Sequence, residues 1–131
     1  MQILTATNRS ENIFAPVCSA LRQELDNVEL LFSNNWTNAL AAIKVMPPEF
    51  LILDQSLPEG EVLELARELV AVNAAVNCIV VTDMDAETFH EASEGLGIFA
   101  SLPLDPTFED GVALAGRIQR FMGVATGKGA S

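Results

Sequence analysis

Several side chains that can ligate a cation or make hydrogen bonds stand directly after apolar runs of the chain. They are Thr7, Asn8, Asp54, Gln55, Thr82 and Asp83. Asp54 is the ionisable group placed at the end of a central apolar run, in the context LILDQSLP. Carboxylates ligate hard cations and can act as nucleophiles, and they also accept hydrogen bonds from loop N–H groups. Asp54 is therefore the first candidate for chemistry.

The segments that must position these side chains alternate between strand and helix. We expect five strands, at Gln2–Ala6, Val28–Phe32, Phe50–Leu53, Cys78–Val81 and Ile98–Leu102. Apolar residues spaced three and four apart predict five helices, over Arg9–Asp26, Trp36–Val45, Glu61–Val72, Asp83–Glu94 and Asp105–Met122. The expected N-caps of the first, fourth and last helices are Ser10, Asp85 and Asp105.

This alternation predicts one α/β domain with a doubly wound parallel sheet and helices on both faces. The runs Phe50–Leu53 and Cys78–Val81 are continuously apolar, which is typical of strands buried on both sides. The functional crevice of such a sheet lies outside the carboxyl ends of its strands. We expect the domain to cover residues 1–122 and the Gly-rich residues 123–131 to form a flexible tail.

The residues at the crevice resemble the receiver domains of bacterial response regulators (the CheY-like family). Six residues carry the resemblance in order and spacing: Asp54, Pro58, Thr82, Gly95, Phe99 and Pro103. It covers almost the whole of residues 1–122. The resemblance implies a flavodoxin-like sheet in the order 2-1-3-4-5, with Asp54 as phosphoacceptor. It also implies that Thr82 is associated with the site and that Phe99 is the switch aromatic.

Four positions depart from the family pattern. Thr7 and Asn8 stand where the family has two acidic ligands for Mg²⁺, and Leu102 stands where it has a lysine. Asp83 adds a carboxylate where the family usually has a small residue. Mg²⁺ prefers carboxylate oxygens, so we expect no resident cofactor, with Asp54 and Asp83 as the remaining candidate metal ligands.

These departures predict an atypical receiver with an incomplete phosphorylation site. We expect it to act in two-component signal transduction through protein–protein contact, not as an enzyme. The implied partners are a histidine kinase or another signalling protein. A second copy of the chain is another possible partner, in a homodimer through the fourth helix, fifth strand and fifth helix. Five residues are expected near that face: Phe89, His90, Ala92, Ile118 and Phe121. The alternative is a working receiver phosphorylated on Asp54.

Two other site types have less support in the sequence. The segment Thr5–Ser10 is placed like the phosphate loop of flavodoxins, but it contains no glycine, and Trp36 is the chain's single tryptophan for stacking on a flavin. A small flavin- or nucleotide-binding domain is therefore the third hypothesis. His90, the single histidine, has no nucleophile with motif support around it, so we expect a surface residue.

Composition narrows the remaining classes. The 131 residues carry 7 Lys and Arg against 18 Asp and Glu, a net charge of −11, which disfavours nucleic acid and anionic membranes as partners. Cys18 and Cys78 stand in separate apolar patterns and are expected to be buried thiols. The N-terminus has no signal-peptide pattern and no apolar run is long enough to span a bilayer, so we expect a cytoplasmic protein.

Overall fold

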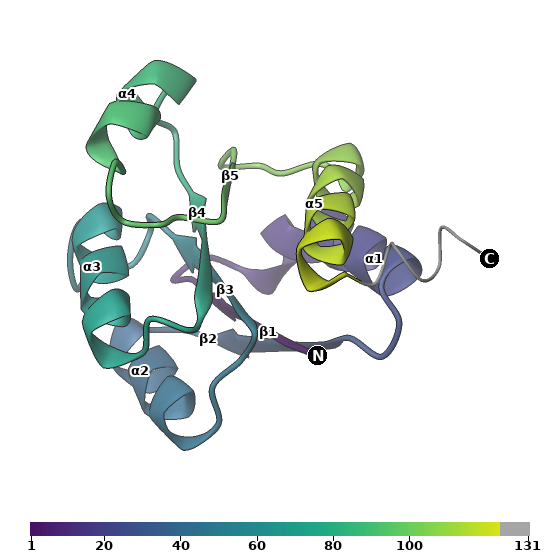
Figure 1. Ribbon diagram of the computed structural model, residues 1–131, viewed down its shortest axis with the longest axis horizontal. Helices are drawn as coiled ribbons and strands as arrows, with labels where there is room; N and C mark the ends of the chain where they lie inside the picture. The colour runs from purple at the N-terminus through teal and green to yellow at the C-terminus, as the bar shows by residue number, and fades with distance from the viewer. Residues whose placement is uncertain (124–131) are drawn as a thin grey trace.

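The structure is a computed structural model, and it describes residues 1–123 (Figure 1). Five parallel strands form one sheet in the order β2-β1-β3-β4-β5. The strands are β1 (Gln2–Ala6), β2 (Glu29–Ser33), β3 (Phe50–Asp54), β4 (Asn77–Val81) and β5 (Ala100–Leu102). The helices are the 3₁₀ helix η1 (Glu11–Phe14), then α1 (Ala15–Glu24), α2 (Trp36–Val45), α3 (Val62–Val72), α4 (Ala86–Ala92) and α5 (Phe108–Met122). The predicted fold class and strand order are confirmed.

The central strand β3 explains why the sheet has helices on both faces. All five of its residues are buried. Leu51 and Leu53 join the apolar cluster under α2 and α3, whereas Phe50 and Ile52 join the cluster under α1 and α5. Side chains alternate across a strand, so a continuous apolar run must be covered on both sides. Figure 1 shows these two helical layers on opposite faces of the sheet.

The first predicted helix is in fact split into η1 and α1. Ser10 caps η1, as expected, by accepting a hydrogen bond from the backbone N–H of Asn12. Pro16 follows at the start of α1 and has no N–H to donate to the carbonyl of Asn12. The N–H of Ala15 bonds to that carbonyl instead, which closes a tighter 3₁₀ turn.

Three other elements differ from the predictions by more than one residue at an end, whereas β2, β3, β4 and α3 differ by a single residue. The last helix begins at Phe108, because Thr107 is its N-cap and forms a capping box with Asp110; the prediction of Asp105 as its cap was wrong. The helix α4 is shorter than expected, although its predicted cap Asp85 does accept from the N–H of Thr88. The strand β5 covers three residues, since pairing with β4 begins at Ala100.

Both cysteines are buried, free thiols, as expected. Burial raises the pKa of both thiols, that of Cys78 to about 12. No helix within residues 1–123 is long and apolar enough to cross a bilayer. Gly123 ends α5 in the left-handed conformation at φ 74°. The rest of the predicted tail, residues 124–131, lies outside the described residues.

Candidate functional site

The carboxyl ends of β1 and β3 bring Thr7 and Asp54 into direct contact. The Asp54 side chain is fully buried, and the Thr7 hydroxyl donates to its Oδ2 at 2.7 Å. Parallel neighbours end at the same edge of a sheet, and Ala6 is paired with Leu53, so the two residues that follow these positions meet. Two of the residues singled out in the sequence, Thr7 and Asp54, therefore lie together around one buried carboxylate.

Arg9 forms a bidentate ion pair with this carboxylate. Its Nε lies 2.8 Å from Asp54 Oδ2, and its Nη2 lies 2.9 Å from Oδ1. Nη2 also donates to the carbonyl oxygen of Leu104 at 2.9 Å, and Nη1 lies 3.8 Å from Asp105 Oδ1. The guanidinium fork matches both carboxylate oxygens at once, which is a strong geometry for such a pair. Arg9 thus connects the loop after β1 to the end of β3 and to the loop after β5.

Ser56 completes the set of donors around Asp54. Its hydroxyl donates to Oδ2 at 2.6 Å and accepts from the backbone N–H of Asn8 at 2.9 Å. Burial raises the pKa of Asp54, but the hydrogen bonds from Arg9, Ser56 and Thr7 and the charge of Arg9 outweigh it. The pKa of Asp54 is therefore below its ordinary value, and the carboxylate is ionised and fully hydrogen-bonded.

Thr82 belongs to a separate hydrogen-bond group. Its hydroxyl donates to Gln55 Oε1 at 2.8 Å and accepts from the N–H of Met84 at 3.2 Å. Gln55 Oε1 also accepts from the N–H of Asp83 at 3.0 Å. The Thr82 hydroxyl is consequently committed to Gln55 and donates no hydrogen bond to Asp54.

Five other residues singled out in the sequence lie around the site without touching the carboxylate by a hydrogen bond. Asn8, Pro58, Asp83 and Pro103 are exposed, and Leu102 is buried in the apolar cluster under α1 and α5. Asn8 contributes its backbone N–H, to Ser56. At this position the chain therefore has an apolar, packed side chain instead of the charge that a lysine would supply.

Phe99, the switch candidate, is held by aromatic and cationic contacts. Its ring makes edge contacts with Phe50 and Phe121, at centroid distances of 5.0 and 5.2 Å. The Arg117 guanidinium lies 5.5 Å from the centre of the ring, and its Nη2 donates to the Phe99 carbonyl at 2.8 Å. The ring is partly buried, at the edge of the surface between α4 and α5.

The residues around Asp54 do not fit the Mg²⁺ that the receiver resemblance implies. Within residues 1–123, no group of three or more His, Cys, Asp or Glu side chains is placed to hold a metal ion. The groups that contact Asp54 are two hydroxyls and the Arg9 guanidinium. The guanidinium binds the carboxylate oxygens that a metal ion would need as ligands. A divalent ion there would be repelled by Arg9, because like charges at such distances disfavour each other strongly.

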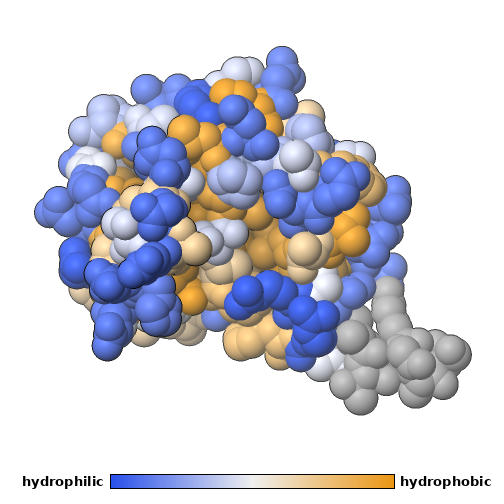
Figure 2. Space-filling view, turned by 90° about the horizontal axis from the view of Figure 1, so that it is seen from above, coloured by the Kyte–Doolittle hydropathy of each residue, from blue (hydrophilic) through white to orange (hydrophobic). Residues whose placement is uncertain are grey.

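A hollow of about 550 Å³ lies at the carboxyl ends of β4 and β5 and is lined by Thr82, Asp83, Leu102 and Pro103 among others. Another, of about 510 Å³, lies in the surface formed by α4, β5 and α5 and is lined by Phe89, His90 and Phe99 among others. Figure 2 looks onto this side and shows apolar surface between hydrophilic borders. His90 is exposed, as expected. Ile118 was assigned to this face wrongly: it is fully buried, because it faces the sheet.

Arg9 and Ser56 are the site residues that sequence reasoning missed. Both stand within two residues of positions that were named, Thr7 and Asp54. The available signal was a cation three residues beyond the first strand, in a chain with 7 basic residues. Its pairing with Asp54 spans 45 positions of sequence, which no local pattern reports.

Comparison with known proteins shows that this chain resembles solved structures in its fold. No protein-family model matches the sequence, and no curated protein matches it either. Among solved structures, the signal receiver domain of a DNA-binding response regulator (merR) from Colwellia psychrerythraea 34H has a TM-score of 0.74 and 14% identity, covering 93% of this chain and 98% of that one. The isolated REC domain of RcsB from Salmonella enterica serovar Typhimurium has a TM-score of 0.75 and 18% identity, covering 92% and 88%.

A CheY-like receiver domain from Methanospirillum hungatei JF-1 is similar over 97% of both chains, with a TM-score of 0.72 and 19% identity. At these identities the likeness establishes the fold, a five-stranded sheet of receiver type in the order 2-1-3-4-5.

Proposed function

We propose that this chain is a receiver-type signalling module that acts through protein–protein contact without phosphorylation of Asp54. The observation that carries the proposal is the bidentate Arg9–Asp54 pair on a fully buried carboxylate. Arg9 supplies, as part of the chain, the positive charge that a metal ion and a lysine provide in the receiver pattern. The state of the site is then set by folding and not by a phosphodonor.

Access and charge both support this proposal. An oxygen that attacks phosphorus needs a free lone pair and an open approach. Oδ2 already accepts from Arg9, Thr7 and Ser56, and Oδ1 is bound by Arg9 Nη2 at 2.9 Å. Phosphoryl transfer depends mainly on positioning and on cations that neutralise the transferred group. Here the cation is bound to the nucleophile itself, and Leu102 is apolar.

We infer that the output surface is the face formed by α4, β5 and α5. The helix α4 buries none of its residues, and Phe121 on α5 is 56% exposed. Five carboxylates lie on or beside α4: Asp83, Asp85, Glu87, Glu91 and Glu94. This acidic border favours a signalling partner, a histidine kinase among them, that presents basic residues. It disfavours a contact in which the α4 borders of two copies of the chain face each other.

The test of the phosphorylation-independent site exposes the protein to acetyl phosphate with Mg²⁺ and, separately, to beryllofluoride with Mg²⁺. Intact mass and amide NMR spectra report the two reactions. We expect no phosphoryl adduct and no shifts at Asp54, Thr82 or Thr7. The REC domain of RcsB, whose structure was determined with beryllofluoride, is the positive control.

A phosphoryl adduct that is abolished by Asp54→Asn would overturn the proposal and favour the alternative, a working phosphoacceptor. Arg9→Ala is the informative second variant. If Arg9 is what closes the site, Mg²⁺ should shift the amides around Asp54 in this variant and leave those of the parent protein unchanged.

The charge argument for the output surface predicts a monomer at low ionic strength. Sedimentation velocity measures the oligomeric state of the parent and of Phe121→Ser. A matched control is Val45→Ser at the end of α2, where the side chain is 85% exposed. A dimer of the parent protein that dissociates in Phe121→Ser but not in Val45→Ser would contradict this prediction. The partner at this surface would then be a second copy of the chain and not a basic protein.

A further inference from the structure

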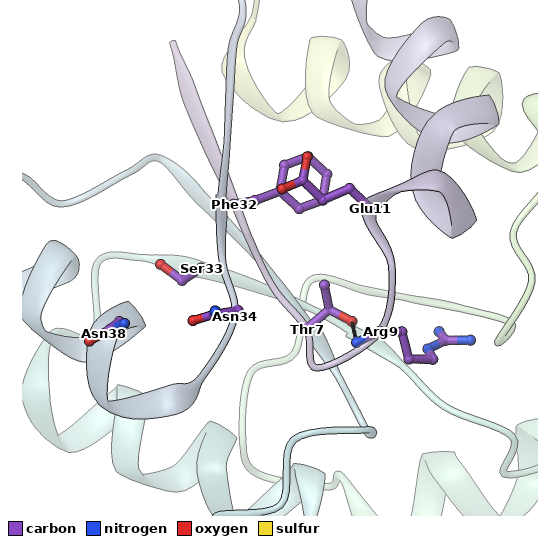
Figure 3. Close-up of a pocket in the computed structure, with 7 residues that line it drawn as sticks. All are labelled: Thr7, Arg9, Glu11, Phe32, Ser33, Asn34 and Asn38. Carbon is purple, nitrogen blue, oxygen red and sulfur yellow. Dashed lines mark hydrogen bonds between the residues drawn. The ribbon is translucent and has the colours of Figure 1, made fainter.

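A further cavity lies at the carboxyl ends of β1 and β2, beside the Asp54 site, with which it shares Thr7 and Arg9 (Figure 3). Its volume is about 360 Å³. It is lined by residues from three segments: Thr7, Arg9 and Glu11 after β1, Phe32, Ser33 and Asn34 around the end of β2, and Asn38 on α2. None of these residues except Thr7 and Arg9 has a part in the site described above.

The electrostatic character of this cavity is acidic in spite of Arg9. The Arg9 guanidinium is neutralised by Asp54, and in Figure 3 the side chain extends away from Ser33, Asn34 and Asn38. The Glu11 carboxylate makes no hydrogen bond or ion pair with any residue in 1–123. The unbalanced charge at the cavity is therefore negative, in a chain whose net charge is −11.

The other groups at the cavity are an aromatic ring and hydrogen-bonding side chains. Phe32 is partly buried; its ring lies 6.5 Å from that of Phe14, and it also lines the cavity. The Ser33 hydroxyl and the Asn38 amide make no side-chain hydrogen bonds within the described part of the chain. An aromatic face beside a free carboxylate and amide oxygens is the combination that binds organic cations.

We propose that this cavity binds a small organic cation that carries a guanidinium or primary ammonium group. Glu11 forms the ion pair, Phe32 supplies the cation–π surface, and the oxygens of Ser33 and Asn38 accept the remaining N–H groups. An anionic ligand is disfavoured, because Glu11 would repel it and Arg9 is already paired.

The cavity is physically connected to the Asp54 site through Thr7. The Thr7 N–H donates to the carbonyl of Ser33 at 3.0 Å, and its hydroxyl donates to Asp54 at 2.7 Å. A ligand held against Ser33 and Thr7 would thus contact the residue that carries one of the hydrogen bonds of Asp54. Binding of the cation to this cavity does not depend on the proposed function. The phosphodonor experiment reports on Asp54, whereas the ligand titration reports on the cavity, so the two proposals can fail independently.

The test is a titration of ¹⁵N-labelled protein with agmatine, which carries both cationic groups, and with 1,4-butanediol as the neutral control. We expect saturable shifts at Glu11, at Phe32–Asn34 and at Asn38 with agmatine, and none with the diol. Glu11→Gln should weaken binding about tenfold or more, the loss expected for one hydrogen bond to a charged group.

Glu109→Gln is the matched control, because Glu109 is an exposed carboxylate in the first turn of α5 that does not line the cavity. It should bind agmatine like the parent protein. Phe32→Leu should weaken binding while the spectrum remains that of the folded protein. Shifts spread over the acidic surface, equal affinity of Glu11→Gln and the parent, or no saturation would each overturn the proposal.

Discussion

Arg9 and Asp54 depend on each other because of where the chain places the carboxylate. A fully buried, unpaired carboxylate would be strongly destabilising, and each oxygen of Asp54 has a charged donor from Arg9. Arg9 itself remains 23% exposed, so its own loss of hydration is partial. Thr7 and Ser56 occupy the remaining acceptor capacity of Oδ2. Asp54 is thus a structural centre for three loops.

The first residue-scale prediction concerns removal of the cation. Arg9→Ala leaves a buried carboxylate with hydroxyl donors alone, and we expect a loss of roughly 3 kcal/mol in the free energy of unfolding. Arg9→Lys should recover part of this loss, because it restores the charge without the bidentate geometry. Urea denaturation at neutral pH measures both. Equal stability of Arg9→Ala and the parent would show that the pair is dispensable.

The second residue-scale prediction concerns acid. The pKa of Asp54 is lower in the folded state than in the unfolded chain. Asp54 therefore contributes stability above the ordinary aspartate pKa of about 3.9, and this stability is lost as the pH falls through the folded-state pKa. In Asp54→Asn, the free energy of unfolding should decrease less than in the parent protein as the pH is lowered through this acid range.

Asp83→Asn is the matched control for the acid measurement. The Asp83 side chain is exposed and makes no side-chain hydrogen bond within residues 1–123. Its acid profile, recorded by urea denaturation at a series of pH values, should follow that of the parent. A parent and Asp54→Asn with parallel profiles would contradict the role given to the ion pair.

At the scale of elements, the contact between α1 and α5 depends on a glycine. A Cβ at Gly111 would lie 2.7 Å from the Cβ of Ala20 and 3.0 Å from the Cα of Val17. The two helices approach closely because this position carries no side chain. That approach covers the face of the sheet that includes Phe50 and Ile52.

Gly111→Ala should therefore destabilise the fold by about 1–3 kcal/mol, the usual cost of overpacking a close contact. Gly116→Ala is the control in the same helix, because its Cβ would meet only the flexible end of Arg120, at 3.4 Å. We expect that change to be neutral or to stabilise by up to about 1 kcal/mol through helix propensity. Thermal unfolding compares the two, and an equally stable Gly111→Ala would refute the packing argument.

At the scale of the whole molecule, the excess of carboxylates repels itself. The net charge is −11, and both ion pairs found within residues 1–123 involve Arg9. Most of the carboxylates in residues 1–123 are exposed, and we expect their mutual repulsion to destabilise the folded state at low ionic strength. The negative electrostatic potential of these carboxylates also favours the binding of basic partners and organic cations.

We predict that the melting temperature rises when NaCl is increased from about 10 mM to about 100 mM, over which the Debye length falls from about 30 to about 10 Å. A variant with Glu64→Lys and Glu87→Lys, both on exposed helical surface, should gain less from the same salt. Differential scanning calorimetry measures both proteins. A melting temperature that is unchanged or falls with salt would contradict the repulsion.

The fold could be predicted from the sequence because its signals are local. The apolar runs at β3 and β4 are continuous, which requires a sheet covered on both faces, and the helical spacing between them sets the alternation of elements. The sequence by itself also determined that Asp54 stands at the end of the central strand and that both cysteines are buried. Element ends were less predictable where a proline or a capping residue decides them, as Pro16 and Thr107 do.

The tertiary structure alone decided what surrounds Asp54. The pair with Arg9 spans 45 positions, and the hydrogen bond from Arg9 to Leu104 spans 95, so neither leaves a periodic signal in the sequence. The same holds for Thr82, whose hydroxyl bonds Gln55 because two parallel strands end side by side. Hydrophobic burial follows a pattern along the chain, whereas a hydrogen bond between side chains depends on distances and angles that exist only after the sheet has assembled.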